Sequence, residues 1–191
     1  IALKRPTSNL QNVINIFNFY SQDGEKLFNK IIWKNCDILD IIVLDEIVKN
    51  IQIIYHCAAL VSFNNELKNQ MLEVNTVGTS NIIDLSLKHN IKQICYVSSI
   101  ATLGKNEDLP ADENTHWSWE NKSGYAISKY LAEMEVWRGF NEGLNGFIVN
   151  PSLIIGPGFW DSGIGTIIKK TLISGPFYVS GSCGVIDVND L

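Results

Sequence analysis

The sequence predicts an α/β fold with a doubly wound parallel sheet, and three observations support this prediction. Short apolar segments alternate along the chain with longer segments of helical periodicity, an order that is typical of parallel β–α–β units. Small or polar residues directly follow several of the apolar segments, and open α/β sheets bind ligands at the carboxyl ends of their strands. The chain has 191 residues, which suits one domain with a sizeable core.

The strands are predicted from short runs rich in Ile, Val and Tyr. The third run is followed by an Ala-Ala pair and the fourth by a Ser-Ser pair. Pro151 halts the fifth run, because proline cannot donate to a sheet ladder. The predicted strands are Ile1–Lys4, Ile31–Lys34, Ile53–Cys57, Gln93–Val97 and Phe147–Asn150.

The helices are predicted between these strands. The clearest is Gly124–Gly143, in which Ile127, Leu131 and Met134 recur at the spacing of one helical face. The other predicted helices are Leu10–Tyr20, Val43–Lys49 and Asn65–Asn90.

Composition narrows the classes of function. The net charge of −5 argues against nucleic-acid binding, which needs clustered Lys and Arg, and favours a small-molecule ligand. No apolar run reaches the roughly 18 residues of a bilayer span, and no secretory signal is visible, so a cytoplasmic protein without membrane contact is expected. The four cysteines form no CxxC pair, which favours buried thiols in a reducing compartment and no metal site.

Neither end of the sequence looks like a natural terminus. The chain begins at Ile1, inside the end of a predicted strand, and stops at Leu191 just after an Asp-Val-Asn-Asp stretch. We therefore expect the sequence to be a segment of a longer protein.

The sharpest motif is Tyr125-Ala-Ile-Ser-Lys129. Positions i and i+4 share one helix face, so a phenol and an ammonium become neighbours. A free tyrosine has a pKa near 10, and a nearby cation lowers it by roughly 1–3 units, which would make Tyr125 a usable general acid/base. The alternative is a surface Tyr and Lys at helical spacing.

Four further segments accompany this motif. Ser98-Ser99 end a strand, where a hydroxyl can hold a substrate oxygen or simply cap the next turn. The other segments are Tyr55-His-Cys-Ala-Ala59, Asn75-Thr-Val-Gly-Thr79 and Asn150-Pro-Ser-Leu-Ile-Ile-Gly156.

In this order and spacing, the motifs resemble the extended short-chain dehydrogenase/reductase family, the NAD-dependent epimerase/dehydratase group. The resemblance spans essentially the whole chain and implies a Rossmann-type NAD(P)-binding domain at 1–158, followed at 159–191 by the start of a partial C-terminal substrate lobe. It also implies an enzyme, and by fold analogy a possible homodimer formed by the helices that begin at Asn65 and Gly124.

The resemblance implies catalytic and substrate-binding roles. Tyr125 would donate the proton, Lys129 would bind the nicotinamide ribose and lower the tyrosine pKa, and Ser99 would orient the substrate carbonyl, with Ser98 as its main rival. The residues expected at the substrate are Ser99, Ile100, Asn150 and Trp160.

Cofactor-binding roles follow in the same way. Asp37 would accept a hydrogen bond from the adenine amino group, with Ile38 against the ring, and the backbone of Pro151–Ile154 would hold the nicotinamide carboxamide. The residues expected at the cofactor are Lys4, Arg5, Ser8, Asp37, Ile38, Ala58, Ala59, Val61, Asn75, Val97, Tyr125, Lys129, Pro151 and Ile154.

The turn after the first strand favours NADP(H), although NAD(H) remains possible. NAD-selective sites use an acid there for the ribose 2′-hydroxyl, whereas this chain has Lys4, Arg5 and Ser8, which suit a 2′-phosphate. The alternative is a solvated basic turn.

Two departures from the family pattern stand out. The family's Gly-rich phosphate loop is absent and should lie upstream of Ile1, so cofactor affinity is expected to be poor. The first strand would be absent with it, which should separate the strand ending at Lys4 from Ile53–Cys57. Cys36 stands where the family usually has Gly, a mild change in turn geometry.

The subgroup with the best match is the dihydroflavonol reductase and 3β-hydroxysteroid dehydrogenase branch. Ile100-Ala101 replace the acidic pair of sugar-nucleotide dehydratases, and Thr102-Leu103-Gly104 lack the tyrosine usual in epimerases. We expect reduction of a ketone or aldehyde on a small apolar, aromatic or sterol-like substrate. The alternatives are a sugar-nucleotide epimerase with bound NAD and a non-catalytic NADP-sensing protein. The pocket residues proposed, which could equally be ordinary packing, are Trp117, Trp119, Phe159 and Trp160.

Overall fold

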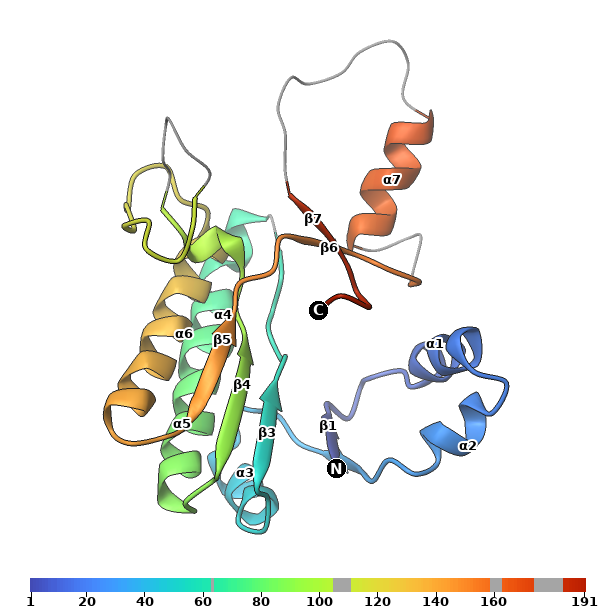
Figure 1. The fold of residues 1–191 in the computed structure, drawn as a ribbon, viewed down its shortest axis with the longest axis horizontal. Helices are drawn as coiled ribbons and strands as arrows, with labels where there is room; N and C mark the ends of the chain where they lie inside the picture. Colours follow the sequence, from blue (N-terminus) through green and yellow to red (C-terminus); the bar gives the residue numbers. More distant parts are fainter. Residues whose placement is uncertain (63, 105–110, 159–162, 174–183) are drawn as a thin grey trace. The chain divides into compact units, whose positions relative to one another are not determined.

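A computed structural model describes residues 1–62, 64–104, 111–158, 163–173 and 184–191 (Figure 1). They form two compact units, one of Cys36–Asn150 and one of Ile1–Asn35 with Pro151–Leu191. All the paired strands described are parallel, and helices follow each of them except β5 and β7 along the chain, which confirms the predicted α/β class. None of the described helices is long and apolar enough to cross a lipid bilayer.

The unit Cys36–Asn150 is built on a three-stranded parallel sheet of order β3-β4-β5. The strands are β3 (Ile53–His56), β4 (Gln93–Val97) and β5 (Gly146–Val149), each within one residue of its predicted bounds. Tyr96 on β4 lies opposite both His56 and Ile148, so one register runs across the sheet.

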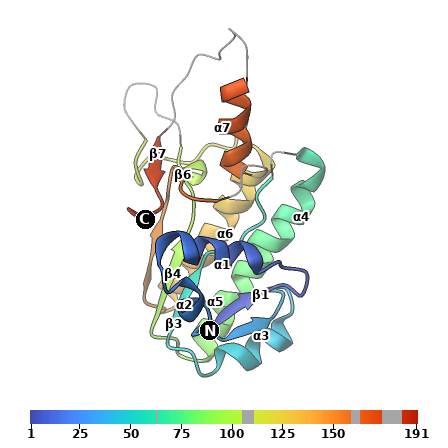
Figure 2. The same ribbon diagram turned by 90° about the vertical axis from the view of Figure 1, so that its right-hand side faces the viewer.

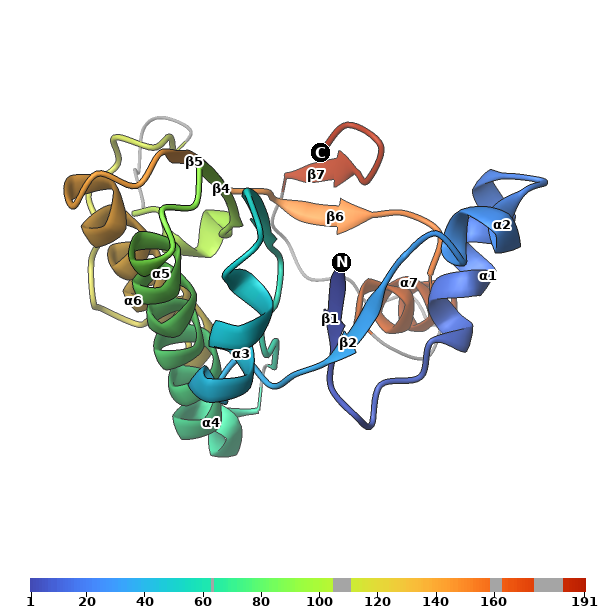
Figure 3. The same ribbon diagram turned by 90° about the horizontal axis from the view of Figure 1, so that it is seen from below.

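Three helices supply the core of this unit, α3 (Ile41–Val48), α5 (Gly78–Lys88) and α6 (Gly124–Asn141). Figure 3 shows α5 and α6 side by side next to the sheet. Their apolar faces pack on alternate strand residues, and each fully buried aliphatic side chain contributes about 1.5–3 kcal/mol. The buried core includes Leu44, Val48, Ile82, Ile83, Ile94, Tyr96, Ala132 and Val136.

The region predicted as one helix over Asn65–Asn90 is interrupted. It begins with a 3₁₀ turn, η1 (Asn65–Leu67), continues as α4 (Lys68–Leu72), and passes through a π-helical turn, η2 (Glu73–Val77), before α5. Single π turns inside helices often accompany functional sites. Here the π turn holds Asn75, which is buried.

The other unit contains shorter elements. β1 (Ala2–Lys4) pairs with β2 (Trp33–Asn35), and the chain between them forms α1 (Gln11–Tyr20) and α2 (Gly24–Phe28) (Figure 2). β6 (Leu153–Ile155) pairs with β7 (Val185–Asp187), and α7 (Gly163–Ile173) lies between them in sequence. Four of these elements, α2, β6, α7 and β7, are not predicted from the sequence.

β1 and β3 lie in different sheets, which agrees with the expected separation of these two strands. The expected lobe boundary at 158 remains a prediction, because 159–162 and 174–183 lie outside the described residues. Cys36 and Cys95 are buried as expected, whereas Cys57 is exposed because it lies just beyond the end of β3. Cys183 lies outside the described residues.

Candidate active site

The two adjacent serines at the carboxyl end of β4 lie in different environments. Ser98 continues the strand alternation, is 4% exposed and donates a hydrogen bond to the buried carboxylate of Glu133. Ser99 is half-buried and caps η3 (Ile100–Thr102), where its Oγ accepts from the Ala101 N–H at 3.2 Å. Of the two serines, Ser99 is the more exposed, whereas the hydroxyl of Ser98 is engaged with Glu133.

Tyr125 lies in the first turn of α6, next to Ser99. The helix begins at this point because the Ser123 side chain accepts from the Ala126 N–H at 3.1 Å. Tyr125 is half-buried, and burial raises the pKa of its phenol above the ordinary value, while a hydrogen bond with Ser99 partly offsets the rise. The phenol and the Ser99 hydroxyl thus form one pair, contributed by a helix start and a strand end.

Lys129 lies one turn further along α6 and is 2% exposed. Its Nζ donates to the Tyr96 hydroxyl and to the Val97 carbonyl oxygen, both at 2.8 Å, which uses two of its three N–H donors. Burial lowers the pKa of Lys129 to about 8, and the charge of Glu133 acts in the opposite direction.

The expectation that Lys129 lowers the pKa of Tyr125 is wrong for this structure. The ammonium is held by the end of β4, and the pKa of the phenol is raised, not lowered, because burial disfavours the phenolate. Helical spacing placed the two residues on one face correctly but could not show how the lysine is partnered.

The segment that follows β3 is exposed to solvent. Ala58, Ala59 and Val61 are exposed, and their small or short side chains leave the backbone accessible to a ligand. Asn75 holds this segment in place: its Oδ1 accepts from the Leu60 N–H at 2.7 Å and its Nδ2 donates to the Leu60 carbonyl at 3.0 Å. These two hydrogen bonds fix the backbone of the exposed segment after β3.

Two expected cofactor contacts need correction. Asn75 is 1% exposed and its amide is used by Leu60 and by Ser128, so it positions the segment instead of meeting a cofactor. Ile38 is buried in the core against Gly78, where an added Cβ would collide with it, so its side chain does not offer a face to an adenine ring. Asp37 is exposed, as an adenine contact requires, although its Oδ1 also accepts from the Leu39 N–H at 3.0 Å.

Several expected residues belong to the other unit, and their roles stay predictions. Arg5 and Ser8 are exposed on a turn closed by a 2.9 Å hydrogen bond from the Ser8 N–H to the Arg5 carbonyl, directly after Lys4 ends β1. Pro151 is buried and Ile154 lies in β6. Phe159 and Trp160 lie outside the described residues.

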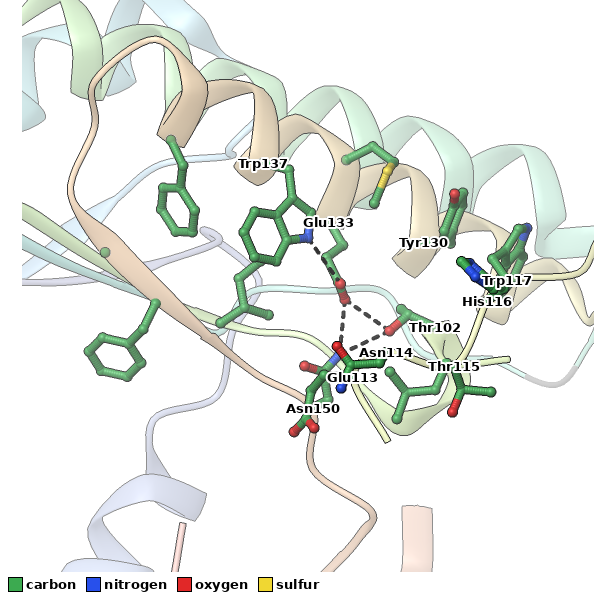
Figure 4. Close-up of a pocket in the computed structure, with 16 residues that line it drawn as sticks. Thr102, Glu113, Asn114, Thr115, His116, Trp117, Tyr130, Glu133, Trp137 and Asn150 are labelled. Carbon is green, nitrogen blue, oxygen red and sulfur yellow. Dashed lines mark hydrogen bonds between the residues drawn. The ribbon is translucent and has the colours of Figure 1, made fainter. Parts of the chain in front are cut away.

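Sequence reasoning missed Glu133, which is 9% exposed on α6. Besides Ser98, its Oε2 contacts the Thr102 hydroxyl at 2.9 Å and the Asn150 amide at 3.0 Å (Figure 4). Asn150, expected at the substrate, is thus engaged with Glu133, and it also donates to Thr102 at 2.9 Å. The i+4 spacing of Glu133 from Lys129 was the signal that could have revealed it.

Glu133 also lines a cavity of about 880 Å³ along α6 and β5. Trp117, one of the expected pocket residues, lies in the wall of this cavity, where its ring stacks on that of Tyr130 with the ring centroids 4.2 Å apart (Figure 4). Ser99, Tyr125 and Lys129 are not among the residues that line this cavity, and a contact of Trp117 with substrate stays a prediction. Trp119 is exposed and packs edge-on against Trp117. Within the part of the chain described, no three His, Cys, Asp or Glu side chains gather as a metal site would need.

Comparison with known proteins identifies relatives for most of the chain. Residues 39–188 match an NAD-binding family model described as "Male sterility protein". A putative dihydroflavonol 4-reductase of Synechocystis sp. is 34% identical over 154 residues, which cover 78% of this chain and 44% of that protein. Cinnamoyl-CoA reductase 1 of Petunia hybrida is 27% identical over 168 residues, 81% of this chain and 49% of that protein. The chain thus spans about half the length of these relatives.

Solved structures also resemble this chain over most of its length. The crystal structure of gox2253 superposes with a TM-score of 0.80 at 30% identity, over 98% of this chain and 55% of that one. A UDP-glucose 4-epimerase from Thermotoga maritima gives a TM-score of 0.68 at 19% identity, over 83% of this chain and 56% of that one, which supports the fold alone. The chain belongs to the extended short-chain dehydrogenase/reductase family of NAD(P)-dependent reductases, dehydratases and epimerases.

Proposed function

We propose that the protein reduces a ketone or aldehyde of a small apolar, aromatic or sterol-like compound with NADPH. The observation that carries the proposal is the pairing of Ser99 with Tyr125 at the carboxyl end of β4, the strand end that also holds the buried Lys129 through the Val97 carbonyl. A hydroxyl donor, an ionisable phenol and a cation within one site are what proton transfer to a carbonyl oxygen requires.

Each residue has a distinct task in this proposal. A bound nicotinamide cofactor supplies the hydride. The Ser99 hydroxyl donates a hydrogen bond to the carbonyl oxygen and so holds it beside the Tyr125 phenol. As negative charge develops on that oxygen, Tyr125 donates its proton. Lys129 is held by Tyr96 and Val97, and its remaining N–H donor would serve a bound cofactor.

The electrostatics of Tyr125 favour reduction. Because burial raises the pKa of the phenol, Tyr125 carries its proton at neutral pH and can give it to an alkoxide. Oxidation of an alcohol would instead start from the phenolate, which this environment disfavours. Reductases among the relatives, named for dihydroflavonol and cinnamoyl-CoA, support a carbonyl substrate with an aromatic portion.

An epimerase is the second candidate. A putative UDP-glucose 4-epimerase of Methanocaldococcus jannaschii is 32% identical over 130 residues, 65% of this chain and 42% of that protein. Such an enzyme would leave the total amount of reduced cofactor unchanged, whereas a reductase consumes it.

Tyr125→Phe in the full-length protein tests the proposal. It removes the ionisable hydroxyl and keeps the ring, so kcat for an accepted ketone should fall by roughly 10²–10⁴-fold while NADPH affinity stays near the wild-type value. The measurement is NADPH oxidation by absorbance with a panel of aromatic and sterol-like ketones, alongside NADPH binding by fluorescence. The exposed Tyr20→Phe is the matched control. A Tyr125→Phe enzyme with the wild-type rate would refute the mechanism, and interconversion of a sugar nucleotide without net NADPH loss would favour the epimerase.

A further inference from the structure

Glu133 and Lys129 are two buried ionisable residues of opposite charge on α6. They are one turn apart on the same face, and both are at least nine-tenths buried. A buried charge is costly unless it is paired and hydrogen-bonded. Glu133 has no part in the proton transfer proposed above, so its burial needs another explanation.

The other titratable groups around Lys129 are neutral at neutral pH. From β3 and the residue after it, burial lowers the pKa of His56 to about 3 and raises that of the Cys57 thiol. Burial raises the pKa of the Tyr96 hydroxyl on β4 and of Tyr125 on α6. Among these described neighbours, Glu133 is left as the anion that faces the Lys129 ammonium, and its charge raises the pKa of that lysine.

The same carboxylate also fixes the position of Ser99. Its Oε2 is contacted by Ser98, Thr102 and Asn150, from β4, η3 and the end of β5. Thr102 in turn lies 2.8 Å from the Ser99 carbonyl oxygen, and the Asn150 amide donates to that oxygen at 3.3 Å. Glu133 therefore joins the backbone of the catalytic serine to the helix that carries Tyr125 and Lys129.

We propose that Glu133 is a positioning residue of the active site, the counter-charge of Lys129 and the anchor that holds Ser99 against α6. The inference rests on the proposed function, in which a charged Lys129 and a fixed Ser99 serve proton transfer. It assigns two separable contributions to one side chain, charge and hydrogen bonding.

Glu133→Gln separates these contributions. The amide oxygen of glutamine can still accept from Ser98 and Asn150, but the negative charge is lost. Glu135→Gln is the matched control, because Glu135 lies on the same helix and binds Arg138 at 2.9 Å and Ser80 at 3.2 Å instead. Glu133→Asp keeps the charge on a shorter side chain and should restore most of what Glu133→Gln loses.

The primary readout is the titration of Lys129 in the full-length protein, followed by ¹³C NMR of lysine side chains. The resonance is identified by its absence in Lys129→Met. In the wild type its midpoint is expected near pH 8. Glu133→Gln should move it to lower pH by about one pH unit, while Glu135→Gln leaves it in place. In the alkaline limb of kcat for ketone reduction, Glu133→Gln should lose activity at correspondingly lower pH.

Two results would overturn the inference. One is an unchanged Lys129 midpoint in folded Glu133→Gln. The other, decided on the wild type alone if the variant does not fold, is a Glu133 ¹³Cδ resonance of a protonated carboxyl at pH 7. A wild-type protein that shows the expected lysine titration but reduces no ketone would refute the proposed function and leave the counter-charge intact, so the two failures are distinguishable.

Discussion

Replacing Ser98 and Ser99 by alanine, one at a time, should lower mainly the stability in the first variant and mainly kcat in the second. Ser98 is 4% exposed and donates to the buried Glu133 carboxylate, so Ser98→Ala loses a hydrogen bond to a charged group, which is about 1.5–3 kcal/mol of folding free energy. At roughly 2–4 °C per kcal/mol for a domain of this size, Tm should fall by about 3–12 °C.

Ser99→Ala should show the opposite balance. Besides its pairing with the Tyr125 phenol, its Oγ makes a long cap contact, 3.2 Å to the Ala101 N–H, and the residue is only half-buried, so the folding free energy should fall by about 1 kcal/mol or less. Loss of an oriented donor to the developing oxyanion should lower kcat by about 10²-fold or more. For Ser98→Ala, the loss of kcat should stay below about tenfold, because the Ser99 hydroxyl is intact.

The assay measures both quantities on the same preparations of the full-length protein. Urea unfolding at pH 7 gives the free energy of unfolding, and NADPH oxidation with one accepted ketone gives kcat. Ser118→Ala, at an exposed serine, is the control that should change neither. If Ser98→Ala abolishes turnover while Ser99→Ala leaves it intact, the assignment of the catalytic hydroxyl is off by one residue and the reasoning from burial fails.

Two further predictions concern the cofactor and acid stability. Replacing Lys4 and Arg5 by Ala should weaken NADPH binding more than NADH binding by about 1–3 kcal/mol, measured by fluorescence titration, and equal losses would show that this turn does not read the 2′-phosphate. Because burial lowers the pKa of His56 to about 3, the unfolded chain takes up a proton below about pH 6.5 that the folded state does not. The contribution of neutral His56 to the free energy of unfolding should therefore be fully present above about pH 6.5 and should fall by up to about 1.4 kcal/mol per pH unit as the pH drops toward 3. In urea titrations at pH 7 and pH 5, His56→Gln should reduce this loss of stability.

The elements around the site could be predicted from sequence because their patterns are local. β4 matches its predicted bounds because it is a short apolar run that ends at a Ser-Ser pair. α6 differs at its end by two residues, and local signals mark both ends, the Ser123 cap and the positive φ of Gly143. The face predicted from Ile127, Leu131 and Met134 is not the buried face of this helix. The π turn at Glu73–Val77 was not predictable in this way, because it leaves the overall helical pattern of its segment unchanged. α2 and β6, of five and three residues, are too short to show a period.

The candidate site could be predicted in part. Spacing placed Tyr125 and Lys129 on one helix face, and strand position placed a serine beside them. The direction of the Tyr125 pKa could not be predicted, because it depends on how deeply the phenol is buried and on the partners of Lys129, which come from β4. Both are tertiary properties that helical spacing does not determine.

Glu133 shows which local signal could have extended the prediction. The buried face of α6 carries Ser128, Lys129 and Glu133 among its small and apolar residues. A helix face that packs on a core normally excludes such groups, and sequences break this pattern mainly where function requires it. Once Tyr125 fixes the face of α6 that meets the sheet, the spacing puts Lys129 and Glu133 on it, and a buried lysine requires a buried partner of opposite charge. The proposed positioning acid is thus implied by the proposed catalytic pair together with the burial of Lys129, although by neither one alone.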